Sequence, residues 1–178
     1  MVTIETARLQ CKIDHDFEDS LVQIYIDAAR EWVENYTGRA LTQRAEVMEY
    51  DSFCDRHVHN RPALVSKFRP LESVVTILYT DTNGDDETLA PAEFRVVGNA
   101  VYAAAGKSFP QVQTPSKVVM TANVGEAAED VPASLKQAVL LLISHYYNNR
   151  DAVEVGTITA TLPMGVKALC DAYRPSRV

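Results

Sequence analysis

The sequence predicts an α+β protein, mainly an α-helical bundle of about four helices with an inserted small antiparallel β sheet or barrel. Hydrophobic residues recur at helical spacing near both ends of the chain. The middle instead carries runs rich in Val, Ile, Thr and Tyr, separated by most of the prolines and glycines. We therefore expect residues 1–41 and 130–178 to form a discontinuous helical core, and residues 42–129 to form a β-rich insert.

Two helices are expected in the first part of the chain. Thr3 can cap a short helix that ends near Cys11, and Asp16 is a good N-cap for a long second helix. Gly38 stands where a left-handed C-terminal cap belongs, so the long helix is expected to end there.

Two apolar stripes follow the spacing of the long helix. The first stripe contains Phe17, Leu21, Ile24, Ala28, Trp32 and Tyr36, and the second contains Val22, Ile26, Ala29 and Val33. Their combined arc is wider than one core face requires. Either this helix is nearly enclosed, or one of its flanks meets another subunit.

The middle of the chain is expected to form several strands. The clearest strand is Leu71 to Thr80, and Asn83-Gly84 after it is a strong hairpin signal. Further strands are expected at residues 47–50, 94–97, 100–103 and 117–122. The prolines expected to fall between the strands are Pro62, Pro70, Pro91, Pro110 and Pro115.

The last part of the chain is expected to be helical again. Asp130 as N-cap and Pro132 in the first turn predict a helix from Ala133 to about Asn149 that is apolar almost all round. A loop at 152–162, a short helix at about 164–173 and a basic tail complete the chain.

Composition excludes several classes of protein. The 178 residues are 47% hydrophobic and 23% charged, which is typical of a globular domain rather than a disordered, collagen-like or coiled-coil chain. The net charge of -7 argues against a broad DNA-coating surface. The N-terminus does not resemble a signal peptide, and the longest apolar runs are far too short to span a bilayer, so no membrane partner is expected. Cys11, Cys54 and Cys170 are expected to be reduced thiols in a cytoplasm.

Candidate catalytic and metal-binding patterns are incomplete. On a strand, His57 and His59 would project from one face and could share a metal, but Cys54 would face the other way and no third ligand is specified. A polar loop or exposed strand face explains them better than a metal-dependent enzyme does. Gly106-Lys107-Ser108 resembles the end of a phosphate loop, but Val101 stands where that loop needs a glycine. We expect no catalytic residues, no metal and no cofactor.

A nucleic-acid-binding function has weak support. Arg61, Lys67 and Arg69 lie near Phe53 and Phe68, a pattern that can bind single strands by stacking. Residues 42–129 also contain 12 Asp and Glu, which oppose such binding. A nucleic-acid-binding DNA-packaging accessory factor therefore remains the alternative function.

Four groups of motifs, taken in order along the chain, resemble one family. The groups are IDHDFED (13–19) with IDAARE (26–31) and TGRAL (37–41); LESV (71–74) with YTD (79–81); VP (131–132) with KQA (136–138) and YNNR (147–150); and LPMGV (162–166). The sequence resembles the long variant, with a β insert, of the head-tail connector (adaptor) proteins of long-tailed double-stranded-DNA phages, prophages and gene transfer agents.

This resemblance implies a structural role without catalysis. Connectors of this family form a ring, about twelvefold in the virion, below the portal protein, and they extend the DNA channel. They present a platform for the next neck or tail-completion protein, and DNA passes through without sequence-specific binding. The implied locations are the host cytoplasm during assembly and then the virion neck.

A ring needs two different contact surfaces on each subunit, which would use the excess apolar residues of the two long helices. The candidate interface residues are Leu21, Val22, Ile26, Trp32, Tyr36, Leu140, Leu141, Tyr146, Tyr147, Arg150 and Arg174. Packing inside the core would explain several of these residues equally well. The loop-rich, basic segment 152–178 is expected to dock on the portal or on a neighbouring subunit.

Overall fold

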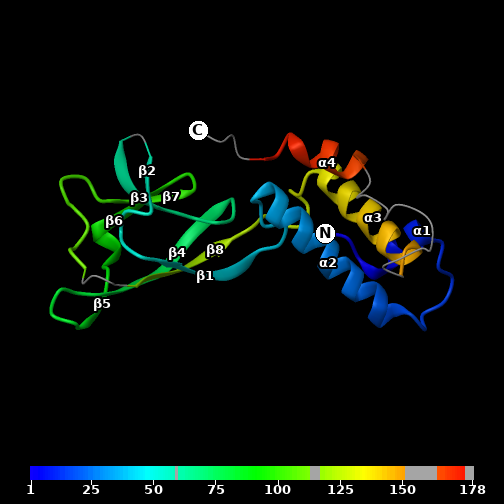
Figure 1. The fold of residues 1–178 in the computed structure, drawn as a ribbon, viewed down its shortest axis with the longest axis horizontal. Coiled ribbons are helices and arrows are strands. Elements are labelled where there is room, and N and C mark those ends of the chain that lie inside the picture. The colour runs from blue at the N-terminus through cyan, green and yellow to red at the C-terminus, as the bar shows by residue number, and fades with distance from the viewer. Residues whose placement is uncertain (59, 113–116, 151–163, 175–178) are drawn as a thin grey trace, which may run out of the picture. The chain divides into compact units, whose positions relative to one another are not determined.

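The computed structural model describes residues 1–58, 60–112, 117–150 and 164–174. Within these residues it contains four α-helices, one 3-10 helix and eight strands (Figure 1). The α+β class and the number of helices are confirmed. The description of the chain as mainly a helical bundle is only partly confirmed, because the strands form two separate sheets.

The chain divides into two compact units. One unit comprises residues 1–41 together with residues 127–178, and we call it the helical unit. The other comprises residues 42–126, and we call it the β unit. The helical unit is therefore built from both ends of the chain, whereas the β unit is one continuous segment.

The helical unit packs four helices around one core. Its helices are α1 (Ile4–Cys11), α2 (Asp19–Thr37), α3 (Ala133–Asn148) and α4 (Met164–Asp171). Figure 1 shows α2, from the blue end of the chain, alongside α3 in yellow, with α4 next to α3. The buried side chains include Val22, Ile26, Ala29 and Val33 of α2 and Leu135, Ala138, Val139 and Leu142 of α3. The second of the two predicted stripes on α2 is thus the core-facing one.

Local signals located two helix ends correctly. The Thr3 side chain accepts a hydrogen bond from the Thr6 amide at the start of α1. Gly38 ends α2 in the left-handed conformation, with φ 63°, and its amide donates to the Glu34 carbonyl. Both predicted caps are confirmed, because each depends only on residues within one helical turn.

The predicted N-caps Asp16 and Asp130 are wrong. Helix α2 begins only at Asp19, and the Asp16 carbonyl instead accepts the Asp19 amide in a turn. Contacts with other helices set this end, because Arg8 of α1 binds the Asp19 carboxylate. Helix α3 begins at Ala133 after Pro132, and Asp130 lies in a preceding turn.

The β unit contains two four-stranded antiparallel sheets. The first has the order β1-β8-β4-β5, and the second has the order β2-β3-β7-β6. The strands of the first sheet are β1 (Arg44–Tyr50), β4 (Leu71–Thr80), β5 (Asp86–Thr88) and β8 (Val118–Val124). Those of the second are β2 (Arg56–Val58), β3 (Arg61–Val65), β6 (Phe94–Val97) and β7 (Ala100–Ala103), with the 3-10 helix η1 (Pro91–Glu93) before β6. The described residues form no closed barrel.

The strand predictions succeed where the sequence is strongly β-forming. Strands β4, β6 and β7 have the predicted limits, and the turn containing Gly84 joins β4 to β5. Strands β2 and β3 were not predicted, and Pro62 lies inside β3 rather than between strands. The pairing of β3 with β7 involves only Leu64 and Val65, so Pro62 lies outside that ladder.

None of the helices that the structure describes has both the length and the apolar character needed to cross a membrane.

Candidate assembly surfaces

Cys54 and His57 lie close together at the possible metal site. His57 is exposed on β2, and its Nδ1 atom lies 3.6 Å from the Cys54 sulfur. Cys54 precedes β2 rather than lying in a strand, so the expectation that it faces away from His57, which assumed a regular strand, does not apply. His59 lies outside the described residues. No group of three or more potential metal ligands occurs among the residues that are described.

The predicted interface residues differ greatly in their exposure. Val22 and Ile26 are 1% and 3% exposed and belong to the helical core, so their side chains are not on the surface of the unit. Leu140, Leu141 and Tyr146 are half-buried and pack against the same core. The remaining candidates, apart from Leu21, fall into two polar clusters.

The first cluster joins the start of α2 to the end of α3. The Tyr147 hydroxyl donates to Glu18 Oε2 at 2.6 Å, and Arg150 Nη2 lies 2.8 Å from Glu18 Oε1. The Arg150 guanidinium also lies over the Tyr147 ring, 4.5 Å from its centroid. The hydrogen bond from Tyr147, followed by the interaction with Arg150, holds the pKa of Glu18 below its ordinary value. The same hydrogen bond raises the pKa of Tyr147.

The second cluster joins the end of α2 to α4. Trp32 and Tyr36 stack with ring centroids 4.9 Å apart, and the Tyr36 hydroxyl donates to Asp171 Oδ1 at 2.7 Å. The Arg174 guanidinium lies over the Tyr36 ring, 4.8 Å from its centroid. The hydrogen bond to Asp171 raises the pKa of Tyr36. Because Arg174 is exposed, this cluster presents a cation beside an aromatic surface.

A third feature of the helical unit is a pair of exposed apolar side chains near the start of α2, Phe17 in the preceding turn and Ile24 on the helix, which we call the α2 flank. Phe17 is 89% exposed and Ile24 is 62% exposed, and Leu21 between them in the sequence is half-buried. Phe17 and Ile24 were predicted as part of a helical stripe but not as candidate interface residues. The wide apolar arc predicted either a nearly enclosed helix or a flank that meets another subunit, and it did not indicate which flank that would be.

The β unit has an apolar outer face on its first sheet. Val47 of β1 pairs with Thr121 and Leu78 of β4 pairs with Val119, so these side chains lie on one side of the sheet. Val47 is 61% and Leu78 is 45% exposed. Their neighbours in the strands, Met48, Ile77 and Met120, are buried on the opposite side. Val75, which is 54% exposed, lies at a bulge in β4.

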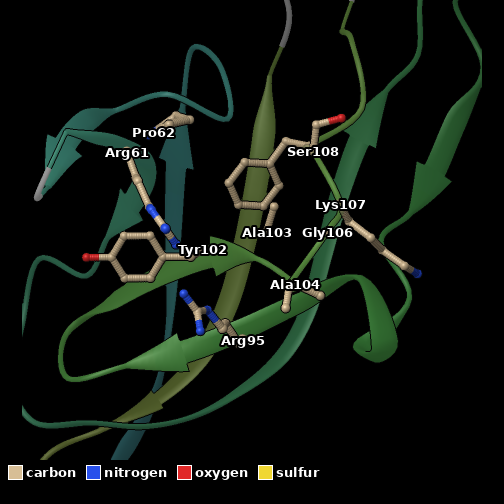
Figure 2. A pocket seen from close by; sticks show the side chains of 11 residues that line it. Arg61, Pro62, Arg95, Tyr102, Ala103, Ala104, Gly106, Lys107 and Ser108 are labelled. Carbon is tan, nitrogen blue, oxygen red and sulfur yellow. The ribbon is translucent and has the colours of Figure 1, made fainter.

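A pocket lies in the β unit between the second sheet and the segment that follows β7 (Figure 2). Its volume is about 480 Å³. Arg61 of β3 and Arg95 of β6 both extend toward Tyr102 of β7, whereas the Lys107 side chain points away from them. Gly106, Lys107 and Ser108, whose pattern failed as a phosphate loop, form part of the lining. No local motif could predict this site, because its residues come from separate segments.

Comparison with known families gives a match over most of the chain. The model described as "Phage gp6-like head-tail connector protein" matches residues 1–67 and 81–174. The chain belongs to this head-tail connector family. The resemblance inferred from the sequence motifs is therefore confirmed, and the two units described above are those of a connector-family chain. The comparison with curated proteins found no match to this chain.

Three similar solved structures come from gene transfer agent (GTA) particles. The first is the neck of an empty GTA particle computed with C6 symmetry, with a TM-score of 0.78, 25% identity, and coverage of 99% of this chain and 91% of the other. The virion of a native GTA particle gives a TM-score of 0.78 at 24% identity, covering 99% of this chain and 91% of the other. The neck of a native GTA particle computed with C12 symmetry gives a TM-score of 0.71 at 24% identity, covering 100% and 94%. The fold is thus shared along almost the whole length of the connector-family chain.

Proposed function

We propose that this chain is a structural head-tail connector that forms a ring in the virion neck, below the portal protein. The ring extends the DNA channel and joins the capsid to the next neck or tail-completion protein. The observation that carries this proposal is the connector-family match over residues 1–67 and 81–174. The similarity to a chain from a GTA neck computed with C6 symmetry supports both the location and a ring.

The apolar surfaces supply what ring assembly requires. A closed ring uses heterologous contacts, in which one patch of a subunit meets a different patch on the next subunit. The α2 flank and the outer face of the first sheet are two such patches. Each is apolar and exposed opposite a buried face of its own element. We infer that both become buried between subunits.

We propose that a neck partner binds at the second polar cluster. Trp32, Tyr36 and Arg174 combine stacked aromatic rings with an exposed cation, a composition that is enriched in protein interfaces. We propose that this cluster contributes to the portal contact expected for segment 152–178. Residues 151–163 and 175–178 of that segment lie outside the described residues. Val22 and Ile26 would act indirectly, by holding α2 against α3.

The acidic chain suits a role in which DNA passes without binding. A net charge of -7 repels phosphates rather than collecting them. The alternative function as a nucleic-acid-binding packaging factor gains no support from the family match, which is to connectors. We propose a structural rather than an enzymatic role.

The ring is tested by the double substitution Phe17→Glu and Ile24→Glu. Burying two added carboxylates in a subunit contact is costly, whereas both positions are exposed in the single chain. We expect the wild-type chain to form a large closed species, alone or on the portal, and the variant to stay monomeric with an unchanged melting temperature. Absolute mass by light scattering and electron microscopy of the large species measure this.

The matched control adds the same charge elsewhere in the helical unit. Ala133 and Gln137 are exposed on α3, and Ala133→Glu with Gln137→Glu should leave assembly intact. A wild-type chain that forms no ring, alone or with the portal, would contradict the proposed function. Assembly of the Phe17/Ile24 variant would contradict the role of this flank only.

The portal contact needs a variant that spares the core. Removing residues 163–178 is expected to abolish portal binding, but Val166 and Cys170 of α4 are fully buried, so that truncation also damages the helical unit. Lys167→Glu with Arg174→Glu changes only exposed cations. We expect this variant to stay folded and to lose capture by immobilised portal, and normal capture would refute the proposed portal contact.

A further inference from the structure

The pocket of the β unit contains two arginines without partners among the described residues. Arg61 and Arg95 are both exposed, and neither guanidinium forms an ion pair or hydrogen bond with a group of another described residue. Lys107, on the same lining, is 3.9 Å from the Glu93 carboxylate and is therefore partly neutralised. The pocket consequently has an excess of positive charge that this part of the chain does not balance.

The geometry of this site favours a carboxylate ligand. Figure 2 shows Arg61 and Arg95 directed toward the same side chain, Tyr102. Tyr102 is only 8% exposed and lines the pocket. Guanidinium groups bind planar carboxylates through paired, charge-assisted hydrogen bonds. A concave site of about 480 Å³ excludes part of the water that would weaken such bonds at an open surface.

The chain itself carries a matching acidic segment, residues 81–87, which comprise the turn after β4 and the start of β5 and which we call the β4–β5 turn. Asp81 holds this turn in shape, because its carboxylate accepts hydrogen bonds from the Asn83 amide at 2.8 Å and the Asp85 amide at 2.9 Å. Asp85 and Glu87 are exposed, and their carboxylates make no ion pair or hydrogen bond with another described residue. A turn that is already ordered loses little conformational freedom when it binds.

We propose that the Arg61/Arg95 pocket receives the acidic β4–β5 turn of a second copy of this chain. This inference rests on the proposed ring, because a head-to-tail contact needs two different and complementary surfaces on one subunit. In the single chain the turn and the pocket form no ion pair between described residues. The contact aligns neighbouring subunits by charge, in addition to the apolar surfaces.

A second copy explains the pocket better than DNA does. Residues 42–126 contain eight Lys and Arg against eleven Asp and Glu, so a phosphate backbone crossing this unit would meet more repulsion than attraction. A short acidic turn, in contrast, can enter the basic pocket alone. DNA binding is therefore an outcome that the experiment must distinguish.

The first experiment measures the contact without a ring. The receptor is the full chain carrying Asp85→Lys and Glu87→Lys, which keeps the pocket but cannot fill it from a neighbouring copy. A fluorescently labelled, cyclised peptide of residues 79–89 is titrated into it and followed by anisotropy. We expect saturable binding that weakens at least about tenfold when Arg61→Glu and Arg95→Glu are added to the receptor.

Controls separate this site from general charge. Adding Lys67→Glu and Lys117→Glu to the receptor reverses two exposed cations outside the pocket and should leave binding within about twofold. A peptide with Asn and Gln in place of Asp and Glu should not bind. Absence of saturable binding at millimolar receptor, or equal loss with both pairs of reversals, overturns the proposal. Binding of a short duplex DNA that depends on Arg61 and Arg95, without peptide binding, overturns it in favour of a nucleic-acid site.

The second experiment uses assembly itself. Arg61→Glu with Arg95→Glu should prevent ring formation, and so should Asp85→Lys with Glu87→Lys, whereas an equal mixture of the two variants should assemble as an alternating ring. Rings formed by each variant alone would refute the contact while leaving the ring intact. Peptide binding as expected, with no ring from any chain even on the portal, would refute the proposed function while leaving the pocket's ligand established.

Discussion

Tyr147 and Glu18 are joined by a 2.6 Å hydrogen bond, although 129 positions separate them in the sequence. The bond connects the end of α3 to the residue that precedes α2, and Arg150 completes the cluster. This long-range contact and the ion pair of Arg8 with Asp19 both hold residues at the start of α2. The contact with Glu18 also makes the stability of the helical unit depend on pH.

Glu18→Gln should remove part of the acid sensitivity of the chain. The pKa of Glu18 is lowered in the folded state, so its charge stabilises the fold above the unfolded value near 4.5, and this stabilisation is lost as the pH falls through the folded pKa. The wild type should therefore melt at a higher temperature than Glu18→Gln at pH 7, and the difference should shrink as the pH falls below the ordinary pKa of 4.5. Melting curves at fixed protein concentration measure it, with Glu31→Gln, an exposed position on α2, as the control. A difference that is independent of pH would contradict this explanation.

Glu34→Ala should destabilise the helical unit by about 1–3 kcal/mol, because it leaves a buried amide without its acceptor. Glu34 is only 4% exposed, and its Oε1 accepts the Leu41 amide at 2.6 Å. Glu34→Gln can keep an oxygen at this position and should cost less. Urea unfolding measures the free energy of unfolding of the wild type, Glu34→Ala and Glu34→Gln. The control Glu31→Ala, on the exposed side of α2, should change this free energy little. Equal losses from the Glu34→Ala and Glu31→Ala variants would show that the buried hydrogen bond is unimportant.

Gly125→Ala should be more damaging than Gly98→Ala. Both glycines have positive φ, 109° and 59°, so alanine strains the backbone at either position. A Cβ at residue 125 would also lie 2.1 Å from the Thr42 carbonyl oxygen, whereas nothing lies within 4 Å of a Cβ at residue 98. We expect Gly98→Ala to cost about 1 kcal/mol and Gly125→Ala clearly more, as measured by urea unfolding. Similar costs would mean that the backbone at Thr42 moves aside easily.

Tyr36→Phe should loosen α4. The variant keeps the stacking with Trp32 but loses the 2.7 Å hydrogen bond to Asp171. We expect faster amide hydrogen exchange across Met164–Asp171, with little change in α3, as measured by mass spectrometry. The control is Tyr25→Phe, which removes a hydroxyl from a ring that packs against Tyr146 instead. Equal exchange of α4 in both variants would contradict a role for the Tyr36–Asp171 bond.

Sequence reasoning predicted the elements whose causes are local. Strand β4 has its predicted limits because a run rich in Val, Ile, Thr and Tyr precedes a turn, and Gly38 ends α2 because of its own backbone freedom. Strands β2 and β3 were missed because they are short, and Pro62 argued against them. They form through pairing with each other and with β7.

The candidate surfaces were harder to predict than the fold. Both stripes of α2 have helical spacing, and contacts with the other helices determine that Val22 and Ile26 are buried while Ile24 is exposed. Tyr36 and Arg174 were chosen as separate interface candidates, but Asp171 links them into one cluster. The Arg61/Arg95 pocket depends on three strands meeting in space, so no spacing in the sequence indicates it.

The division of the helical unit between the two ends of the chain sets an order of events during synthesis. Helices α1 and α2 emerge from the ribosome first, but the core positions of α2 pack against α3, which lies beyond the β unit. At 5–20 residues per second, the intervening segment 42–126 takes roughly 4 to 17 s to translate. Throughout that interval the buried stripe of α2 lacks its contacts with α3, and at its end the β unit has its complete sequence before α3 has been made. The nascent chain therefore folds from its middle outward, and the helical unit closes last.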